Sequence, residues 1–523
     1  MSKEISDVSV LAPETTPARG IVGAATILAL GNISSRVLGL GREIVISYFF
    51  GATGYVSVFR VAFTLVLTLY DFLVGGLMTA ALVPVFSEHA ERKEDFWQLV
   101  SVVLSVLAVM LAIAVIILEL LAEPMFTLLG AGYPDDLRAA GVQMIRLILP
   151  AVFFLGAAGV LSGILLSLKR FTLPSFTTAA FNLGIIVCSI ALAPLIGITS
   201  AVVGVVIGAA GQVIFQFIGL RNAPLRFSLN FSHPALKRIF QLYLPVLGGL
   251  SVALVGVTID RNLASHTGEQ SLAWMQAATY LVQLPLGLVA TAISFAILPN
   301  LSRAITPNEF RSTLAFGLKF VLLLILPAVV ALFILATPVV TLLYEHGAFT
   351  VNDTAQTARA LQFYLLGTTF AAIDQPLIFA FYARKNTLLP NLVAVVGLGI
   401  YLVVALPLIQ PLGYLALVLA NSAQLTGHTL VMLWLAQTRL HGLGGQGLGR
   451  TAIKLVLAAI AMGAVMFWLP TLNLSARSVE AGLKVIVPAL VGAVVYSVAL
   501  KVLRVREAGQ LGDVVRSSLS RKT

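Results

Sequence analysis

The sequence predicts an all-α polytopic membrane protein with about 14 transmembrane helices, built as two six-helix lobes plus two C-terminal helices. Three observations support this fold class. The chain is 59% hydrophobic and only 11% charged, whereas soluble domains carry about 25% charged residues. Apolar segments long enough to cross a bilayer, about 20 residues each, recur along all 523 residues. The chain also repeats part of its own sequence.

Similar segments recur in the two halves at a nearly constant spacing. Segment 81–87 (ALVPVFS) is similar to segment 296–302 (AILPNLS), 215 positions later. Two further pairs keep this register: Thr127–Leu129 with Thr341–Leu343, 214 positions later, and Leu173–Pro174 with Leu389–Pro390, 216 positions later. A register held over so long a stretch indicates duplication. Duplicated membrane bundles are often transporters that move two halves around a central site.

The hydrophobic segments can be placed in order along the chain. They lie near 20–50, 55–87, 96–121, 138–167, 174–195, 198–220, 236–262, 271–302, 312–336, 355–383, 389–409, 412–437, 450–470 and 481–503. Several are longer than an upright span requires, which fits tilted or kinked helices. The first segment is too long for a cleaved signal peptide, so we interpret it as the first span.

These segments predict the domain organisation. The assigned parts are a cytoplasmic N-terminal tail (1–19), an N-lobe of helices 1–6 (20–220), a polar cytoplasmic linker (221–235), a C-lobe of helices 7–12 (236–437), helices 13–14 (450–503) and a basic cytoplasmic tail (504–523).

Basic residues follow the connections in an alternating pattern. Lys and Arg fall on the even-numbered connections and the C-terminal tail, whereas the odd-numbered connections are neutral or acidic. The positive-inside rule therefore predicts that both termini are cytoplasmic. Because each lobe has an even number of spans, the lobes should share one orientation and form a parallel repeat around an axis along the membrane normal.

Ionisable side chains within the spans predict a central polar site. They are Arg36, Arg42, Glu43, Arg60, Asp71, Asp260 and Arg261. An ionisable group at mid-membrane costs roughly 2.5–3.5 kcal/mol on the insertion scale and usually faces a cavity. Arg36 and Glu43 are seven positions apart and share a helix face, as do Arg60 and Asp71, eleven apart. The alternative is that these residues snorkel or form internal ion pairs, which applies most to Arg60 and Arg261.

Other function classes find little support. The net charge of +11 is spread over membrane connections, so we expect no nucleic-acid partner. The six histidines are scattered and Cys188 is the only cysteine, so we expect neither a metal site nor a disulfide. No phosphate-binding Gly-Lys-Ser/Thr loop is present, and we expect no cofactor and no enzymatic activity. His428 and Asn421 lie in an apolar segment, where they either bind a coupling monovalent cation or form an interhelical hydrogen bond.

Several motifs resemble those of the MurJ/MviN family of lipid II flippases, in the multidrug/oligosaccharidyl-lipid/polysaccharide exporter superfamily. The similarity extends over nearly the whole chain. The motifs are 35–39 (SRVLG) followed by Arg42-Glu43, 50–52 (FGA), 61–63 (VAF), 81–84 (ALVP), Asp260-Arg261 with 263–265 (LAS), 281–287 (LVQLPLG), Leu298-Pro299 with 301–303 (LSR), and Leu389-Pro390.

The resemblance implies a V-shaped cavity between two lobes and a location in the bacterial inner membrane. It also implies transport of an undecaprenyl-pyrophosphate-linked peptidoglycan precursor to the outer leaflet, with that lipid and the membrane lipids as partners. Arg36, Arg42 and Glu43 match the family's charged first-helix positions. The sequence departs from the family at two arginine positions, where it has Tyr70 and Tyr280, and Gly75 stands near an expected glutamate.

The residues leave three functions open. The first is a lipid II flippase, because guanidinium groups can replace the water that a pyrophosphate loses. Exporting an anion is favoured by an inside-negative potential, by roughly 2.3 kcal/mol per charge per 100 mV, or an ion gradient can drive it. The second is a flippase for another polyprenyl-linked glycan, which the tyrosines favour. The third is a cation-coupled exporter of small cationic compounds, for which the cavity has too many arginines. An enzyme acting on polyprenyl phosphate would need a carboxylate cluster at a membrane face, and the sequence has none.

Overall fold

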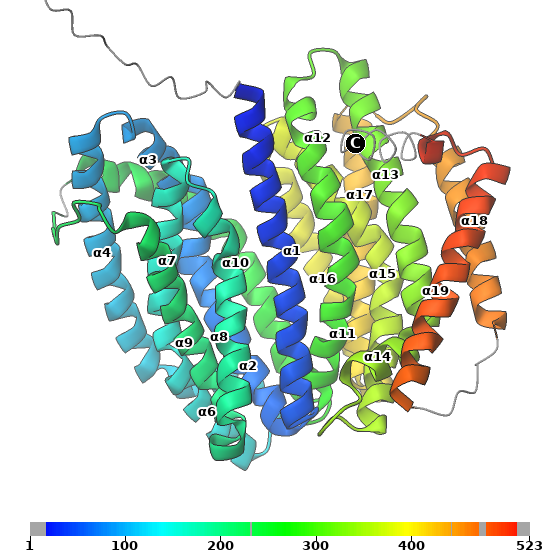
Figure 1. Ribbon diagram of the computed structural model, residues 1–523, viewed down its shortest axis with the longest axis horizontal. Coiled ribbons are helices and arrows are strands. Elements are labelled where there is room, and N and C mark those ends of the chain that lie inside the picture. Colours follow the sequence, from blue (N-terminus) through cyan, green and yellow to red (C-terminus); the bar gives the residue numbers. More distant parts are fainter. Residues whose placement is uncertain (1–16, 231–232, 441, 470–476, 510–523) are drawn as a thin grey trace, which may run out of the picture.

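Helices form the regular structure throughout the part of the chain that the computed structural model describes, residues 17–230, 233–440, 442–469 and 477–509 (Figure 1). Thirteen helices in these residues are long and apolar enough to cross a membrane. With α1 (Pro17–Phe50), which is 34 residues long, they account for the predicted number of spans. The fold class predicted from the sequence is therefore confirmed. Most of the expected N-terminal tail and the C-terminal tail beyond residue 509 lie outside the described residues.

Residues 17–220 form nine α-helices, two short π-helices and one short 3-10 helix. They are α1, α2 (Gly54–Tyr70), π-helical η1 (Asp71–Gly75) and η2 (Met78–Leu82), α3 (Val83–His89), α4 (Lys93–Leu120), α5 (Ala122–Gly130), α6 (Asp135–Ile148), α7 (Pro150–Ser167), α8 (Thr172–Ile196), α9 (Thr199–Phe217) and 3-10 helical η3 (Ile218–Leu220).

The second half repeats this order, and two helices follow it. The elements are α10 (Pro234–Ser265), α11 (Ser271–Pro285), π-helical η4 (Leu286–Ala290), α12 (Thr291–Arg303), α13 (Pro307–Ile334), α14 (Ala336–Tyr344), α15 (Val351–Ala383), α16 (Leu388–Leu412), α17 (Tyr414–Arg439), α18 (Leu448–Trp468) and α19 (Arg477–Val502). In Figure 1 the first half lies at the left, α1 near the middle, and α18 and α19 at the right edge.

Backbone details recur with the spacing of the sequence repeat. The turn after α8 uses Gly197 with φ 56°, and the turn after α16 uses the equivalent Gly413 with φ 57°. Lys169 and Lys385, which are separated by the same interval, both have a positive φ, 59° and 56°. A positive φ is uncommon for a residue other than glycine. The two halves therefore share local geometry as well as sequence.

Contacts between the halves are reciprocal. The Gly132 N–H donates to Ser265 Oγ at 2.9 Å, and the Ala348 N–H donates to the Tyr48 carbonyl at 2.8 Å. Ala348 lies 216 positions after Gly132, and Ser265 lies 217 positions after Tyr48. The same pair of surfaces thus meets twice, as two-fold symmetry requires. Both contacts lie at the same end of the bundle, so the pseudo-two-fold axis runs along the helices.

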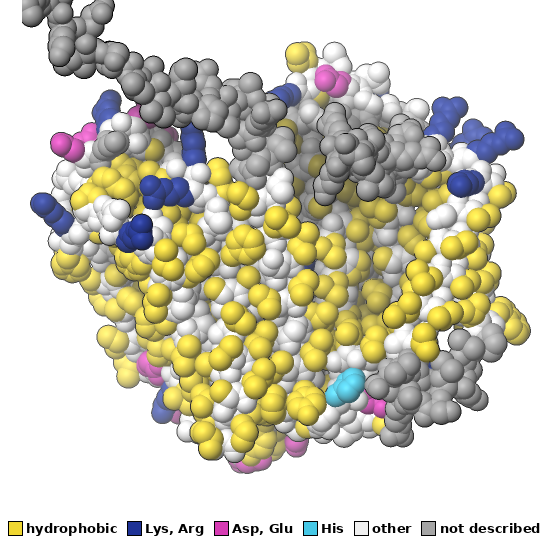
Figure 2. All heavy atoms as spheres, viewed as in Figure 1, with side chains coloured by type: hydrophobic (Ala, Val, Ile, Leu, Met, Phe, Trp, Pro, Cys, Tyr) yellow, Lys and Arg dark blue, Asp and Glu magenta, His cyan; other side chains and the backbone are white. Residues whose placement is uncertain are grey.

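One contact lies close to that axis. The Ala273 N–H at the start of α11 donates to Ser57 Oγ of α2 at 3.3 Å. These residues are 216 positions apart, so each is the counterpart of the other. We call this end of the bundle, with loops 51–53, 131–134, 266–270 and 345–350, the acidic end. The opposite end, where α1 and α10 begin, is called the basic end. On the face of the molecule seen in Figure 2, hydrophobic side chains cover the middle and most Lys and Arg side chains lie near the basic end.

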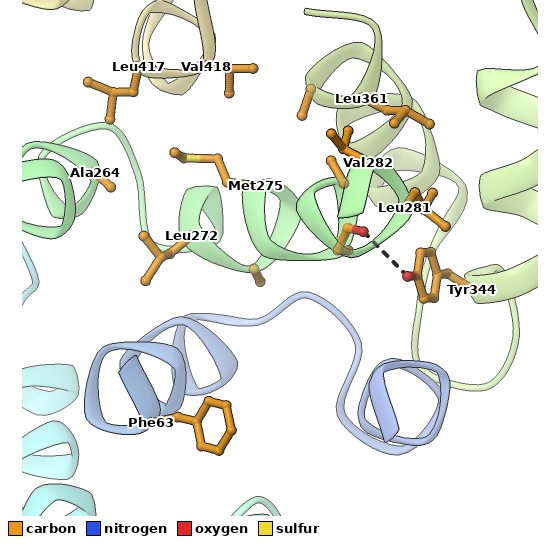
Figure 3. Close-up of a cluster of buried hydrophobic side chains, with 14 of the residues drawn as sticks. Phe63, Ala264, Leu272, Met275, Leu281, Val282, Tyr344, Leu361, Leu417 and Val418 are labelled. Carbon is orange, nitrogen blue, oxygen red and sulfur yellow. Dashed lines mark hydrogen bonds between the residues drawn. The ribbon is translucent and has the colours of Figure 1, made fainter. Parts of the chain in front are cut away.

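The helix α11 is held in the core of the second half. Its residues Leu272 and Met275 are buried, as are Leu281 and Val282 (Figure 3). They pack near α15 and α17, and Tyr344 of α14 donates a hydrogen bond to the Ala277 carbonyl at 3.4 Å. The opposite side of α11 faces α1 and α2, so side chains of this second-half helix contact the first half.

Candidate functional site

Two polar cavities lie on either side of α11. The first, which we call the N-cavity, has a volume of about 660 Å³ and is formed by α1, α2, α7, α8, α9 and α11. The second, the C-cavity, has a volume of about 560 Å³ and is formed by α10, α11, α15, α16 and α17. Gln283 of α11 lines both. Side chains of α11 therefore line both cavities, and this helix lies between them.

Arg42 lies in the wall of the N-cavity and is held on three sides. Its side chain is only 5% exposed. One terminal nitrogen donates to Asn182 Oδ1 of α8 at 2.9 Å, and the other contacts the Tyr280 hydroxyl of α11. The guanidinium carbon lies 4.8 Å from the centre of the Phe63 ring, a favourable cation–π distance. Arg42 is therefore oriented by side chains from both halves.

Arg36 lies six positions before Arg42 on α1 and also lines the N-cavity. Its Nε donates to Asn32 Oδ1 at 3.1 Å, and its Nη1 donates to the Gln283 carbonyl at 3.0 Å. A side chain at Gly287, in the π-turn η4, would overlap the Arg36 guanidinium. The glycine therefore allows an arginine of the first half to reach the backbone of the second.

Close packing of α1 on α8 brings both arginines to this position. Gly31 of α1 sits directly against the backbone and side chain of Ser175 of α8, where a Cβ would overlap. The absence of a side chain at Gly31 allows the backbones to approach, as small residues commonly do in membrane helix pairs.

Asp71 is the acidic residue of the N-cavity. It begins the π-turn η1, directly after α2. A Cβ at Gly75 would lie 2.8 Å from its carboxylate oxygen, so this glycine provides room for the carboxylate. With Arg36 and Arg42, Asp71 gives the N-cavity two cationic side chains and one anionic side chain.

Glu43 and Arg60 line neither cavity. They form an ion pair with each other between α1 and α2, with side chains 1% and 3% exposed. Glu43 Oε2 and Arg60 Nη1 have no hydrogen-bond partner in the described residues. A buried pair of this kind fixes the relative position of two helices, and removing one partner leaves an uncompensated charge. The structure thus places these two of the seven predicted residues behind the cavity.

Asp260 and Arg261 lie in the C-cavity. Asp260 Oδ1 accepts a hydrogen bond from the Tyr401 hydroxyl at 2.7 Å, and its Oδ2 lies 3.4 Å from Arg261 Nη1. Arg261 Nη2 donates to Gln276 Oε1 at 3.4 Å. The charges of this wall are therefore paired, and the two predicted residues are separated from Arg36 and Arg42 by α11.

Carboxamide and tyrosine side chains complete both cavities, and most of them were not predicted from the sequence. Those not singled out include Asn32, Asn182, Gln212, Gln283, Asn391, Gln424 and Tyr401. A carboxamide in an apolar helix is the signal that identifies such residues, and among them the sequence analysis names only Asn421.

Contacts between the halves lie at both ends of the bundle. At the acidic end these are the reciprocal loop contacts. Towards the basic end, Arg238 of α10 pairs with Glu88 of α3 at 2.7 Å, and Tyr243 of α10 donates to the Phe72 carbonyl. The helix α10, near the middle of the view in Figure 1, thus contacts the first-half elements α5, η1 and η2 in addition to α11, α16 and α17 of its own half.

A duplicated helical bundle with charged cavities between its helices defines a membrane transporter with a parallel internal repeat. Sequence comparison identifies the family. The model of the family described as "Lipid II flippase MurJ" matches residues 46–486. The chain belongs to this family and is a multi-pass protein of the inner membrane, and the family predicted from its motifs is confirmed.

Individual relatives agree. A lipid II flippase MurJ from Burkholderia cenocepacia is 28% identical over 455 residues, which cover 84% of this chain and 88% of that protein. A probable lipid II flippase MurJ from Haemophilus influenzae is 26% identical over 468 residues, covering 84% and 91%.

Solved structures share the fold. A structure described as lipid II flippase MurJ in an inward closed conformation has a TM-score of 0.79, with 23% identity, and covers 91% of this chain and 98% of that one. An inward-facing multidrug resistance MATE family transporter has a TM-score of 0.64, with 16% identity, and covers 81% and 99%. The chain therefore has the helix arrangement common to flippases and drug transporters.

Proposed function

We propose that the chain moves lipid II, the undecaprenyl-pyrophosphate-linked peptidoglycan precursor, from the inner to the outer leaflet by alternating access. The observation that carries this proposal is the pair Arg36 and Arg42 in the N-cavity, together with the family match. Two guanidinium groups within one membrane cavity suit a pyrophosphate, because they replace its hydration with charge-assisted hydrogen bonds. The lipid tail remains in the bilayer, so only the head group requires a polar path.

The proposal assigns different roles to the seven candidate residues. Arg36 and Arg42 bind the head group, and Asp71 limits the net charge of the N-cavity. Asp260 and Arg261 form the polar wall of the C-cavity. Glu43 and Arg60 position α1 against α2 and so support Arg42 without contact to the substrate.

We also propose that the basic end faces the cytoplasm, with both termini on that side. The support is the excess of Lys and Arg at this end. In the same scheme residues 20–220 and 236–437 form the two moving lobes, with 221–235 as a cytoplasmic linker. Labelling of single introduced cysteines from outside intact cells tests the orientation. Labelling near residues 131–134 and not near 384–387 is the expected result.

A second candidate is a flippase for another polyprenyl-pyrophosphate-linked glycan. It is favoured by Tyr70 and Tyr280, which line the N-cavity at positions where the family carries arginine. Complementation separates the candidates: cells depleted of their own lipid II flippase should survive when this chain is expressed. Failure to rescue at normal protein abundance would favour the other glycan.

The driving force has two alternatives, a membrane potential or a cation gradient. The potential acts directly on an anionic head group. For a gradient, the second half contains a protonatable pair, His428 Nδ1 and Asp374 Oδ2, 2.9 Å apart. Proteoliposomes given either a potassium diffusion potential or a proton gradient distinguish them. We expect the potential alone to drive translocation.

Arg42 provides the most direct test of head-group binding. Arg42→Ala should abolish translocation but leave insertion intact, because removing an intramembrane charge makes insertion easier. Arg42→Lys should restore activity only in part, since an ammonium group lacks the planar fork of a guanidinium. The measurement is lipid-linked precursor reaching the outer leaflet, detected with an external probe. Arg146→Ala on α6, which lines neither cavity, is the matched control. Full activity of Arg42→Ala at normal abundance would contradict the role.

A further inference from the structure

The C-cavity is polar but has no uncompensated charge. Its two charged side chains, Asp260 and Arg261, are paired with each other and are further engaged by Tyr401 and Gln276. The N-cavity, in contrast, offers Arg36 at its surface. Among the residues that the structure describes, an anionic ligand therefore finds an available cation in the N-cavity and none in the C-cavity.

Three carboxamides in the C-cavity lack partners. Asn391 of α16 and Asn421 and Gln424 of α17 line it, and their side chains form no hydrogen bond within the described residues. Each carboxamide offers two N–H donors and one carbonyl acceptor. Polar groups at membrane depth are costly unless hydrogen-bonded. Three such groups converging on one space are suited to a ligand that carries both donors and acceptors.

The two cavities occupy equivalent places in the two halves. Asn391 of the C-cavity lies 216 positions after Ser175 of the N-cavity, and Gly256 lies 217 positions after Gly39. Duplication thus produced one pocket in each half. Carboxamides line both pockets, but the first carries Arg36 and Arg42, whereas the charges of the second are paired with each other. Gln283 lines both, so the two pockets adjoin at this residue of α11.

We infer that the C-cavity binds a sugar of the head group while the N-cavity binds its pyrophosphate. This inference rests on the proposed function. Carboxamides pair with sugar hydroxyls in both directions, and Tyr364 and Tyr401 provide ring surface in the same cavity. The volume of about 560 Å³ lies within the usual range for ligand sites, about 300–1,000 Å³. A peptide stem with free carboxylates fits less well, because the only cation, Arg261, is already paired.

The test compares two lipids on the purified full-length chain in liposomes. One probe is undecaprenyl pyrophosphate, and the other is the same lipid carrying the disaccharide without peptide. In the variant, Asn391, Asn421 and Gln424 are each replaced by leucine, which preserves size and suits an apolar helix. Asn300→Leu on α12, which lines neither cavity, is the matched control. Binding of the two lipids is measured for the wild-type chain, the variant and the control.

The variant should bind the disaccharide lipid about tenfold or more weakly, since each lost hydrogen bond contributes modestly and three are removed. The affinity of the variant for undecaprenyl pyrophosphate should stay within about twofold of the wild-type value. This result would also show that the variant is folded. Unchanged binding of the disaccharide lipid, equal losses for both lipids, or a loss seen only with a peptide-bearing lipid would each overturn the sugar site. Failure of the proposed function is separate: Arg42→Ala would then bind undecaprenyl pyrophosphate as well as the wild type does.

Discussion

At the scale of single residues, Arg42 illustrates how this chain differs from its family pattern. Tyr280 stands where the family carries an arginine and contacts the Arg42 guanidinium through its hydroxyl. Two guanidinium groups at this position would repel each other until an anion bound between them. The tyrosine instead supports Arg42 without adding charge. That difference concerns cargo affinity and leaves the fold unchanged.

Arg36 depends on a glycine in the other half. Gly287→Ala should displace its guanidinium and break the bond to the Gln283 carbonyl, because the new methyl group would occupy the same space. Hydrogen bonds to charged groups are worth roughly 1.5–3 kcal/mol, so translocation should fall by about tenfold or more. Outer-leaflet appearance of lipid-linked precursor measures this.

A matched substitution provides the control for Gly287→Ala. Gly399→Ala lies in α16, where no atom is within 4 Å of the added methyl group, and it should have wild-type activity. If Gly287→Ala translocates as fast as Gly399→Ala, the contact between Arg36 and the second half has no part in transport.

Sequence periodicity placed Arg36 and Glu43 on a common helix face, but the structure gives them different neighbours. Arg36 and Glu43 share a face of α1, yet two helical turns, about 10 Å along the axis, separate them. Arg42, which is adjacent to Glu43 in sequence, also lines the N-cavity, so depth alone does not decide the environment; Glu43 instead pairs with Arg60 of α2. Whether a charge faces water or an ion partner depends on the neighbouring helix, which a single sequence does not contain.

At the scale of elements, the sequence predicted the features that depend on the length of the hydrophobic segments and on the register of the internal repeat. The number of spans and the paired order of helices follow from these local signals. The π-turns η1, η2 and η4 were not predicted, because they depend on how backbone hydrogen bonds shift when helices pack. The position of α11 between the two cavities was also missed. It results from the burial of Leu281 and Val282 in the second half, which leaves Tyr280 and Gln283 on the other sides of the helix.

The two helices outside the repeat dock on α13. Tyr496 donates to the Leu323 carbonyl at 2.9 Å, and Lys319 Nζ lies 2.9 Å from Glu507 Oε1 just beyond α19. Burial alone would raise the pKa of Glu507, but the hydrogen bond and charge of Lys319 lower this pKa below its ordinary value of 4.5. The paired carboxylate therefore stabilises the docked arrangement.

This pairing predicts a dependence on acid pH. Because the folded-state pKa of Glu507 is lowered, its contribution is present above pH 4.5 and is lost as pH falls through the folded value. Glu507→Gln should therefore melt at a lower temperature than the wild type at pH 7, and the difference should shrink below pH 4.5. Thermal unfolding of the purified chain across this range measures it. Glu94→Gln, on the exposed first turn of α4, should show no such difference; an equal shift in both variants would exclude the ion pair as the cause.

At the scale of the whole molecule, the two halves meet at both ends, but the contacts differ in kind. At the acidic end they are reciprocal and lie around the pseudo-two-fold axis. Towards the basic end they involve α10 and Arg36, and are not reciprocal. Alternating access requires each set to break in turn while α11 stays with the second half. The contacts towards the basic end include the exposed ion pair between Arg238 and Glu88. They should break at a lower free-energy cost than the contacts at the acidic end, because exposed ion pairs contribute little.

Opening at the acidic end can be prevented with one cross-link. Ser57 and Ala273 lie on either side of the axis, with the Ala273 nitrogen 3.3 Å from Ser57 Oγ. Cysteines at these positions, in a chain whose only native cysteine, the buried Cys188, is replaced by alanine, should form a disulfide or react with a short thiol cross-linker. The cross-linked protein should bind lipid-linked precursor but not deliver it to the outer leaflet, and reduction should restore delivery. Each single cysteine variant serves as a control under the same oxidation. Delivery at the wild-type rate by fully cross-linked protein would show that the halves do not separate at this end during transport.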